Sequence, residues 1–224
     1  MNNRLECKSL FAFRRDLFKN IFEDVIYPWE VIPKIKETID KILSAGLDGY
    51  SLLSGKVLVG QNVKIADTAR IEGPAIIGDG CEIRHGAYIR GSVILGDGCV
   101  IGNSSEVKNS ILMDGAQAPH FNYIGDSILG HGAHLGAGAI CSNLRSDKKP
   151  VKITLDESYI TTGMRKLGAI LGDGAEIGCG AVLCPGTVIG KNTTVYPLTL
   201  VRGVYPGNCI VKGNGQSVNK HPIE

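Results

Sequence analysis

The sequence predicts an all-β fold: a parallel β-helix of three-sided coils that follows a short helical segment. Large aliphatic residues recur at every sixth position over most of the chain, glycine accounts for 30 of the 224 residues, and aromatic residues make up only 6%. A six-residue period fits neither an α-helix nor simple strand alternation. It fits a coil that turns a corner after each short strand. Three such sides close one coil of 18 residues, and parallel strands stack successive coils at about 4.8 Å.

The six-residue repeat begins at Val59 and resumes, after interruptions, from Leu129 and from Leu171. Small or β-branched residues occupy the fourth position of most repeats, and Gly, Asp or Asn takes the corners. The pattern breaks between Met113 and Leu129 and again between Ala139 and Ala169. Breaks in a solenoid mark loops, which carry function more often than the coils do. The large aliphatics that we expect to point inward in the first block are Val59, Ile65, Ile71, Ile77, Ile83, Ile89, Leu95, Ile101, Val107 and Met113.

Three segments follow from this pattern: a helical part over residues 1–50, the β-helix over 51–206 and a C-terminal tail over 207–224. Apolar residues lie at helical spacing in 9–26 and again in 31–43, where the second run ends before a glycine. We expect these helices to cap the open end of the β-helix or to pack on a neighbouring subunit. The tail is polar and glycine-rich, so we expect it to be loose.

Composition and charge exclude several classes of protein. A net charge of +2 gives no electrostatic case for nucleic acid. The chain has no apolar run of the ~20 residues that span a bilayer, and its first 20 residues do not form a signal peptide. Seven cysteines, an odd number without a CxxC pair, argue against a disulfide framework or a zinc ribbon. The sequence therefore predicts a cytoplasmic protein with reduced thiols.

Two cations and a histidine are the first candidates for chemistry. Arg90 and Lys108 are 18 residues apart, so they stack on adjacent coils, although opposed like charges cost roughly 0.2–1 kcal/mol. The stack points either to a bound anion such as phosphate or to neutralisation by Glu72, one coil before Arg90. His120 lies in the first break, where an imidazole is either a general base or an ordinary surface group.

Residues 77–202 resemble the C-terminal acetyltransferase domain of bacterial bifunctional N-acetylglucosamine-1-phosphate uridylyltransferase and of related sugar-1-phosphate nucleotidylyltransferases. The resemblance implies a left-handed β-helix, a homotrimer, and acetyl-CoA as cosubstrate bound between two subunits. It implies transfer of the acetyl group to an amino sugar phosphate, with no metal required. The residues that carry it are Arg90, Glu106-Val-Lys108, His120-Phe-Asn-Tyr123-Ile-Gly-Asp126, Leu135-Gly-Ala-Gly138, Asn143, Lys149 and Lys152.

The same resemblance implies a role for each matching residue. His120 is the general base that takes a proton from the attacking amine, and Asn143 positions the acetyl thioester. The substrate-binding positions are Arg90 and Lys108 for the phosphate, Tyr123 for the acceptor sugar or its phosphate, and Lys149 and Lys152 on the loop that completes the site. His134 is a further substrate-binding candidate, at a position where the family has another residue. Acetyl-CoA also contacts the positions of Ala137 and Thr162.

The sequence departs from the family in three places. Asparagine is usual at the position of His134, and the family's Asn-Tyr-Asp-Gly is Asn-Leu-Arg-Ser over 143–146, which leaves the acceptor and the loop conformation open. Residues 1–50 are too few for the nucleotidyltransferase domain, so nothing predicts nucleotidyl transfer.

Two other functions remain as alternatives. One is a non-catalytic trimeric assembly or regulatory module. The other is a metal-dependent enzyme like the β-helical carbonic anhydrases, which bind zinc through three histidines. His85 and His120 have roughly suitable separation for that site, but no third histidine follows His120 within a few residues.

Overall fold

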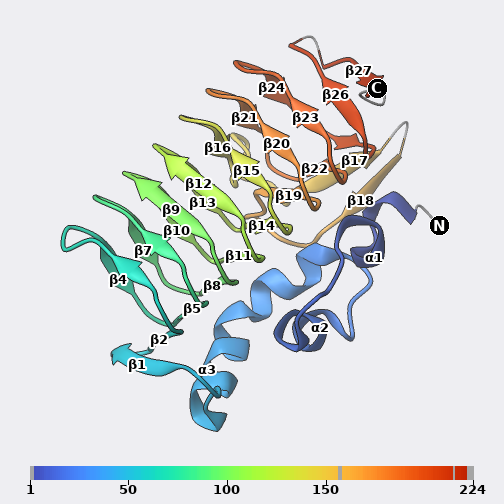
Figure 1. Cartoon of the computed structure of the whole chain (residues 1–224). Helices are drawn as coiled ribbons and strands as arrows, with labels where there is room; N and C mark the ends of the chain where they lie inside the picture. The colour runs from blue at the N-terminus through green and yellow to red at the C-terminus, as the bar shows by residue number, and fades with distance from the viewer. Residues whose placement is uncertain (1–2, 156–157, 214, 221–224) are drawn as a thin grey trace.

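The computed structural model of the chain describes residues 3–155, 158–213 and 215–220. It shows a parallel β-helix with three walls, beside which the N-terminal helices lie (Figure 1). The all-β prediction is confirmed. We call the three parallel sheets wall A, wall B and wall C, in the order in which the chain visits them.

Each wall is built from one short strand of every coil. Wall A contains β2 (Val57–Val59), β5 (Ala75–Ile77), β8 (Val93–Leu95), β11 (Ser110–Leu112), β14 (Ile128–Leu129), β19 (Ala169–Leu171), β22 (Thr187–Ile189) and β25 (Val204–Tyr205). Wall B contains β3 (Lys64–Ile65), β6 (Glu82–Ile83), β9 (Val100–Asn103), β12 (Gln117–His120), β15 (His134–Leu135), β20 (Glu176–Ile177), β23 (Thr194–Val195) and β26 (Cys209–Val211). Wall C contains β4 (Arg70–Glu72), β7 (Tyr88–Arg90), β10 (Glu106–Lys108), β13 (Tyr123–Gly125), β16 (Ile140–Cys141), β21 (Val182–Leu183) and β24 (Leu200–Val201).

The interior of the β-helix is filled by the repeating aliphatic residues, as predicted, but the predicted register fails at one point. Leu95 pairs with Leu112, and Leu112 pairs with Leu129, so both of these coils have 17 residues rather than 18. Leu112 therefore points inward, while Met113 packs outside the β-helix. We expected one break in the repeat before Leu129. The structure instead has two successive coils that are each one residue shorter than 18, and a fixed six-residue count cannot detect such a change.

The N-terminal helices pack along the outside of wall A and not on the open end of the β-helix. They are η1 (Asn3–Leu5), α1 (Cys7–Leu10), α2 (Asp16–Phe22), η2 (Pro28–Lys34) and α3 (Ile35–Ala45). The outward residues of the wall A strands from β2 to β22 are aliphatic and are buried in one cluster with residues of these helices and with Val151, Ile153, Leu155 and Leu167. This packing corrects the end-capping expectation. These outward residues are Leu58, Ile76, Ile94, Ile111, Ile128, Ile170 and Val188.

The first predicted helical run, residues 9–26, is interrupted because the chain there bonds to the β-helix. Asp173 accepts a hydrogen bond from the backbone of Ala12 (2.7 Å), and its own backbone N–H donates to Leu10 (3.0 Å). The residues between α1 and α2 are thus held against the corner between walls A and B.

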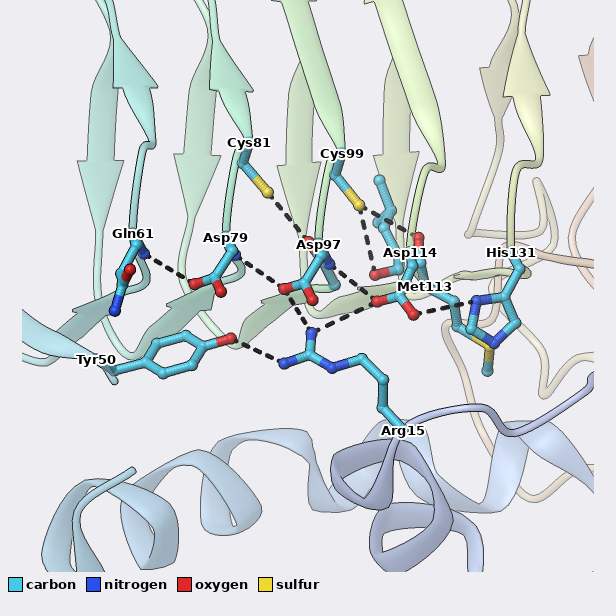
Figure 2. A network of polar contacts seen from close by, with 12 residues as sticks. Arg15, Tyr50, Gln61, Asp79, Cys81, Asp97, Cys99, Met113, Asp114 and His131 are labelled. Atoms are coloured by element: carbon cyan, nitrogen blue, oxygen red, sulfur yellow. Dashed lines mark hydrogen bonds and ion pairs between the residues drawn. The ribbon is translucent and has the colours of Figure 1, made fainter. Parts of the chain in front are cut away.

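Arg15 fastens the same corner (Figure 2). Its guanidinium lies 2.6 Å from the Asp97 carboxylate, 3.5 Å from that of Asp114 and 3.2 Å from the Tyr50 hydroxyl. The carboxylates of these corner aspartates accept backbone N–H groups of the preceding coil, as Asp114 does from Asp97 (2.9 Å). One guanidinium from the N-terminal segment therefore binds two of the turn aspartates at this corner.

The second predicted break is a segment that leaves the β-helix after β16 and returns at β19. It contains an antiparallel hairpin, β17 (Lys152–Leu155) and β18 (Ser158–Thr161). The coils continue across it without a change of register, because β14 pairs with β19 and β16 with β21. We call residues 142–168 the inserted segment.

Both ends of the β-helix carry an antiparallel strand. β1 (Ser51–Ser54) pairs with β2, and β27 (Ser217–Asn219) pairs with β26. The strand β26 lies inside the region that we expected to be a loose tail, and it corrects that expectation, because its Cys209 and Val211 close the last coil. Within the described ranges, no helix is long and apolar enough to cross a bilayer, and the seven cysteines are free thiols.

Candidate active site

Arg90 and Lys108 stack on the outer face of wall C, as the 18-residue spacing predicts. Glu72 pairs in register with Arg90, and β7 pairs with β10 in the register that puts Lys108 next. Each cation already has a carboxylate: Arg90 lies 2.7 Å from Glu106, and Lys108 lies 3.7 Å from Asp126. Glu72 instead binds Arg70 at 2.8 Å. The carboxylates that neutralise the two stacked cations are therefore Glu106 and Asp126 and not Glu72. The stack by itself therefore does not require a bound anion.

Next to these cations, Tyr123 and Asn143 meet on the surface of wall C. The Asn143 side-chain amide donates to the Tyr123 hydroxyl (3.2 Å) and to the carboxylate of Asp126. Burial raises the pKa of the Tyr123 phenol, and the hydrogen bond from Asn143 offsets part of that rise. The hydroxyl therefore keeps its proton at neutral pH and can donate a hydrogen bond to a ligand.

Gly125 is what allows Tyr123 and Asn143 to meet. A β-carbon at this position would lie 2.5 Å from the Asn143 amide nitrogen and 2.7 Å from the Tyr123 hydroxyl oxygen, distances that real structures essentially never show. Gly125 has ordinary strand geometry in β13, so its role is to leave room for the two side chains above it.

His120 ends β12 at the corner between walls B and C, three residues before Tyr123. Its backbone N–H donates to the Asn122 side-chain oxygen (3.1 Å), and its carbonyl accepts from Gly138 (3.0 Å). Asn122 is itself buried and donates to two carbonyls of the next coil. The backbone of His120 is thus held firmly, while its exposed ring has no hydrogen-bond partner among the described residues.

The remaining predicted site residues lie at the His120 corner, on wall B and on the inserted segment. Ala137 sits at the same corner as His120, one coil further on, whereas His134 lies on wall B and pairs with Glu176 (3.0 Å). Lys149 and Lys152 belong to the inserted segment, and the ammonium of Lys152 lies 3.8 Å from the centre of the Tyr159 ring.

Thr162 also lies on the inserted segment, where its hydroxyl donates to the Val151 carbonyl (2.7 Å). This bond closes the base of the hairpin, so the structure gives Thr162 a role in the local fold. Its predicted contact with acetyl-CoA stays a prediction.

Sequence reasoning did not find a cleft of about 420 Å³ between the inserted segment and the last coils of wall C. Arg145, Lys152 and Arg202 line it together with Asp147, which binds Arg145 at 2.7 Å. The charge of this lining is therefore positive. Cys184 and Arg202 both line the cleft and are 18 residues apart. The 18-residue count that stacks Arg90 on Lys108 would therefore also have stacked Arg202 on Cys184.

The two histidines of the carbonic-anhydrase alternative are not adjacent. Asn103 pairs with His120 and lies on the coil between it and His85, so the two histidines are two coil spacings of ~4.8 Å apart. His85 is also engaged by the Thr68 hydroxyl at 2.7 Å. In the part of the chain that the structure describes, no three His, Cys, Asp or Glu residues form a group that could hold a metal ion.

Comparison with known proteins finds similar sequences over most of the chain. Residues 71–161 match the GMPPB C-terminal domain. The chain is 34% identical over 188 residues to the bifunctional sugar-1-phosphate nucleotidylyltransferase/acetyltransferase of Sulfurisphaera tokodaii, covering 82% of this chain and 47% of that protein. It is 40% identical over 177 residues to the bifunctional protein GlmU of Methanococcus maripaludis strain C7, covering 78% of this chain and 43% of the relative.

Among solved structures, a hexapeptide transferase family protein from Anaplasma phagocytophilum aligns with a TM-score of 0.47 at 19% identity, over 74% of this chain and 85% of that one. The chain spans about half the length of the curated relatives it matches. By sequence the chain is thus similar to part of the bifunctional sugar-1-phosphate nucleotidylyltransferases, and its own structure is a three-walled parallel β-helix.

Proposed function

We propose that the protein transfers the acetyl group of acetyl-CoA to the amine of an amino sugar phosphate, with His120 as general base. The observation that carries this proposal is the exposed imidazole of His120, which has no hydrogen-bond partner among the described residues and stands on a corner whose backbone is held by Asn122 and Gly138. A relative that aligns with 82% of the chain is named as an acetyltransferase, which supports the reaction class.

In the proposed reaction, the amine nitrogen attacks the thioester carbonyl carbon. A carbon–nitrogen bond forms, the carbon–sulfur bond breaks, and the amine proton passes through His120 to the leaving sulfur of CoA. The Tyr123 hydroxyl and the Asn143 amide position the substrates, and Arg90 and Lys108 contact the sugar phosphate. Holding two substrates together accounts for most of the rate.

We further propose that the active form is a homotrimer. Wall A is covered by the N-terminal helices, which leaves walls B and C for contacts between subunits. Large apolar residues are exposed on wall C and at its corner with wall B; they are Phe121, Ile140, Leu198 and Leu200. Exposed large apolar residues grouped along one wall are typical of a protein interface, and we call these four residues the exposed strip.

The second candidate is a non-catalytic assembly module. It is favoured by one observation: Arg90 and Lys108 already have carboxylate partners, so wall C is balanced without a phosphate ligand.

An acetyl-transfer assay decides between the two candidates. The protein is incubated with acetyl-CoA and glucosamine-1-phosphate or galactosamine-1-phosphate, and acetylated sugar is measured by mass spectrometry. Mass detection is preferable to thiol detection because Cys179 is exposed and would react with a thiol reagent. We expect acetylated product with at least one acceptor, and no product with any amino sugar phosphate would support the assembly module.

A further inference from the structure

Asp126 is a buried carboxylate at the edge of the proposed site. It exposes only 5% of its surface and follows β13 in a left-handed backbone conformation, φ +49°. Its oxygens accept from the side-chain amides of Asn109 (2.7 Å) and Asn143, and the Lys108 ammonium lies 3.7 Å away. A buried charge is stable only when it is paired and hydrogen-bonded in this way.

The chemistry of these groups fixes how Asn143 is turned. An ionised carboxylate can only accept hydrogen bonds, so Asn143 must present its amide nitrogen to Asp126. That nitrogen carries two hydrogens, and the second is donated to the Tyr123 hydroxyl. The side-chain oxygen of Asn143 is thereby left free to accept a hydrogen bond. The Tyr123 hydroxyl already accepts one from Asn143, so its own proton is left to donate.

We propose that Asp126 is a positioning residue, which orients the Asn143 amide and, through it, the Tyr123 hydroxyl so that wall C presents one acceptor beside one donor. This inference rests on the proposed function. A sugar hydroxyl, which both donates and accepts, matches such a pair. Asp126 does not itself contact substrate; it acts through Asn143 and holds the ammonium of Lys108.

Two substitutions separate orientation from charge. Asp126→Ala removes the acceptor and frees the Asn143 amide to rotate. Asp126→Asn removes the charge but keeps one acceptor oxygen. Lys108, which can only donate, requires that oxygen to remain at the position that also bonds Asn143. The new amide nitrogen then faces Asn109, whose side-chain amide must turn to present its oxygen. Asn62→Ala is the matched control, because Asn62 also has left-handed geometry (φ +56°) but lies far from the site in sequence, on an early coil.

The kinetic test measures kcat/KM for the acceptor. We expect Asp126→Ala to lower it about tenfold or more, Asp126→Asn to stay within about threefold of wild type, and Asn62→Ala to match wild type. The double variant Asp126→Ala/Asn143→Ala should lie within about twofold of Asn143→Ala alone, because both changes break one arrangement. Three results would overturn the proposal: a wild-type kcat/KM in Asp126→Ala, a loss in Asp126→Asn as large as that in Asp126→Ala, or a double variant whose loss equals the product of the two single losses.

A second readout does not depend on acetyl transfer. NMR measures the solvent exchange of the Asn143 side-chain amide protons, which should be slow in wild type, about tenfold or more faster in Asp126→Ala, and slow in Asp126→Asn. If wild type acetylates nothing but the exchange follows this order, the proposed function fails and the positioning role stands. Unchanged exchange in Asp126→Ala would overturn the positioning role itself.

Discussion

A single glycine decides whether the polar groups of the proposed site can meet. The space above Gly125 is occupied by Tyr123 and Asn143, so a methyl group there must displace one of them. We expect Gly125→Ala to lower kcat/KM for the acceptor about tenfold, because the ends of the two side chains must move apart. Gly213→Ala is the control, because a β-carbon at Gly213 meets nothing within 4 Å. Equal activity of the two variants would show that the pair has no role in transfer.

Burial of Cys141 makes stability depend on pH in the alkaline range. Burial inside the β-helix raises the pKa of its thiol from 9.0 to about 12. The folded protein thus keeps this proton where the unfolded chain releases it, so stability falls as pH rises above 9, by about 1.4 kcal/mol per pH unit for one thiol. We expect Cys141→Ala to show a correspondingly weaker decline in urea unfolding between pH 9 and 11. Parallel declines in the two proteins would contradict the assignment.

At the scale of elements, the sequence predicted the strands well because their inward positions repeat. It did not predict where the N-terminal helices dock, although the signal was present: wall A carries aliphatic residues at its outward positions as well, such as Ile76 and Ile94. The register after Val107 was predicted wrongly, because a coil can lose one corner residue while its core remains filled. Such a loss shows only in the pairing of strands.

Arg15 ties the N-terminal segment to the β-helix, and its removal leaves Asp97 and Asp114 without their cation. We expect Arg15→Ala to lower the free energy of unfolding by roughly 1.5–3 kcal/mol, the usual contribution of a hydrogen bond to a charged group. Urea denaturation measures this change, with Arg14→Ala as control, since Arg14 is exposed next to it. A similar stability of the two variants would mean that apolar packing alone holds the segment.

At the scale of the whole molecule, the count of coils placed Arg90 and Lys108 on one wall. Tyr123 and Asn143 came instead from the resemblance to a family, because they lie after the point where a fixed count fails. The sequence could not show that Glu106 and Asp126 neutralise the two cations, since side-chain pairing depends on rotamers and on the shortened coil. Nor could it show the cleft beside the inserted segment, whose lining comes from segments without a repeat.

The exposed strip on wall C leads to a prediction about assembly. Leu200 exposes 63% of its surface on this wall, and Leu52, on the outer strand β1, exposes 61%. We expect Leu200→Arg to shift the protein from trimer to monomer in light scattering coupled to size exclusion, while Leu52→Arg leaves the mass unchanged. A trimer in both variants, or a monomeric wild type, would contradict the proposed interface.

The proposed function depends most on one group, the His120 imidazole at the corner between walls B and C. The most direct measurement compares the rate of acetyl transfer by wild type and His120→Gln at saturating acetyl-CoA, because glutamine is similar in size but cannot take up the amine proton. We expect a fall of about 100-fold or more, within the range of general-base effects, with the unfolding midpoint unchanged. An equal rate in the two proteins would contradict it.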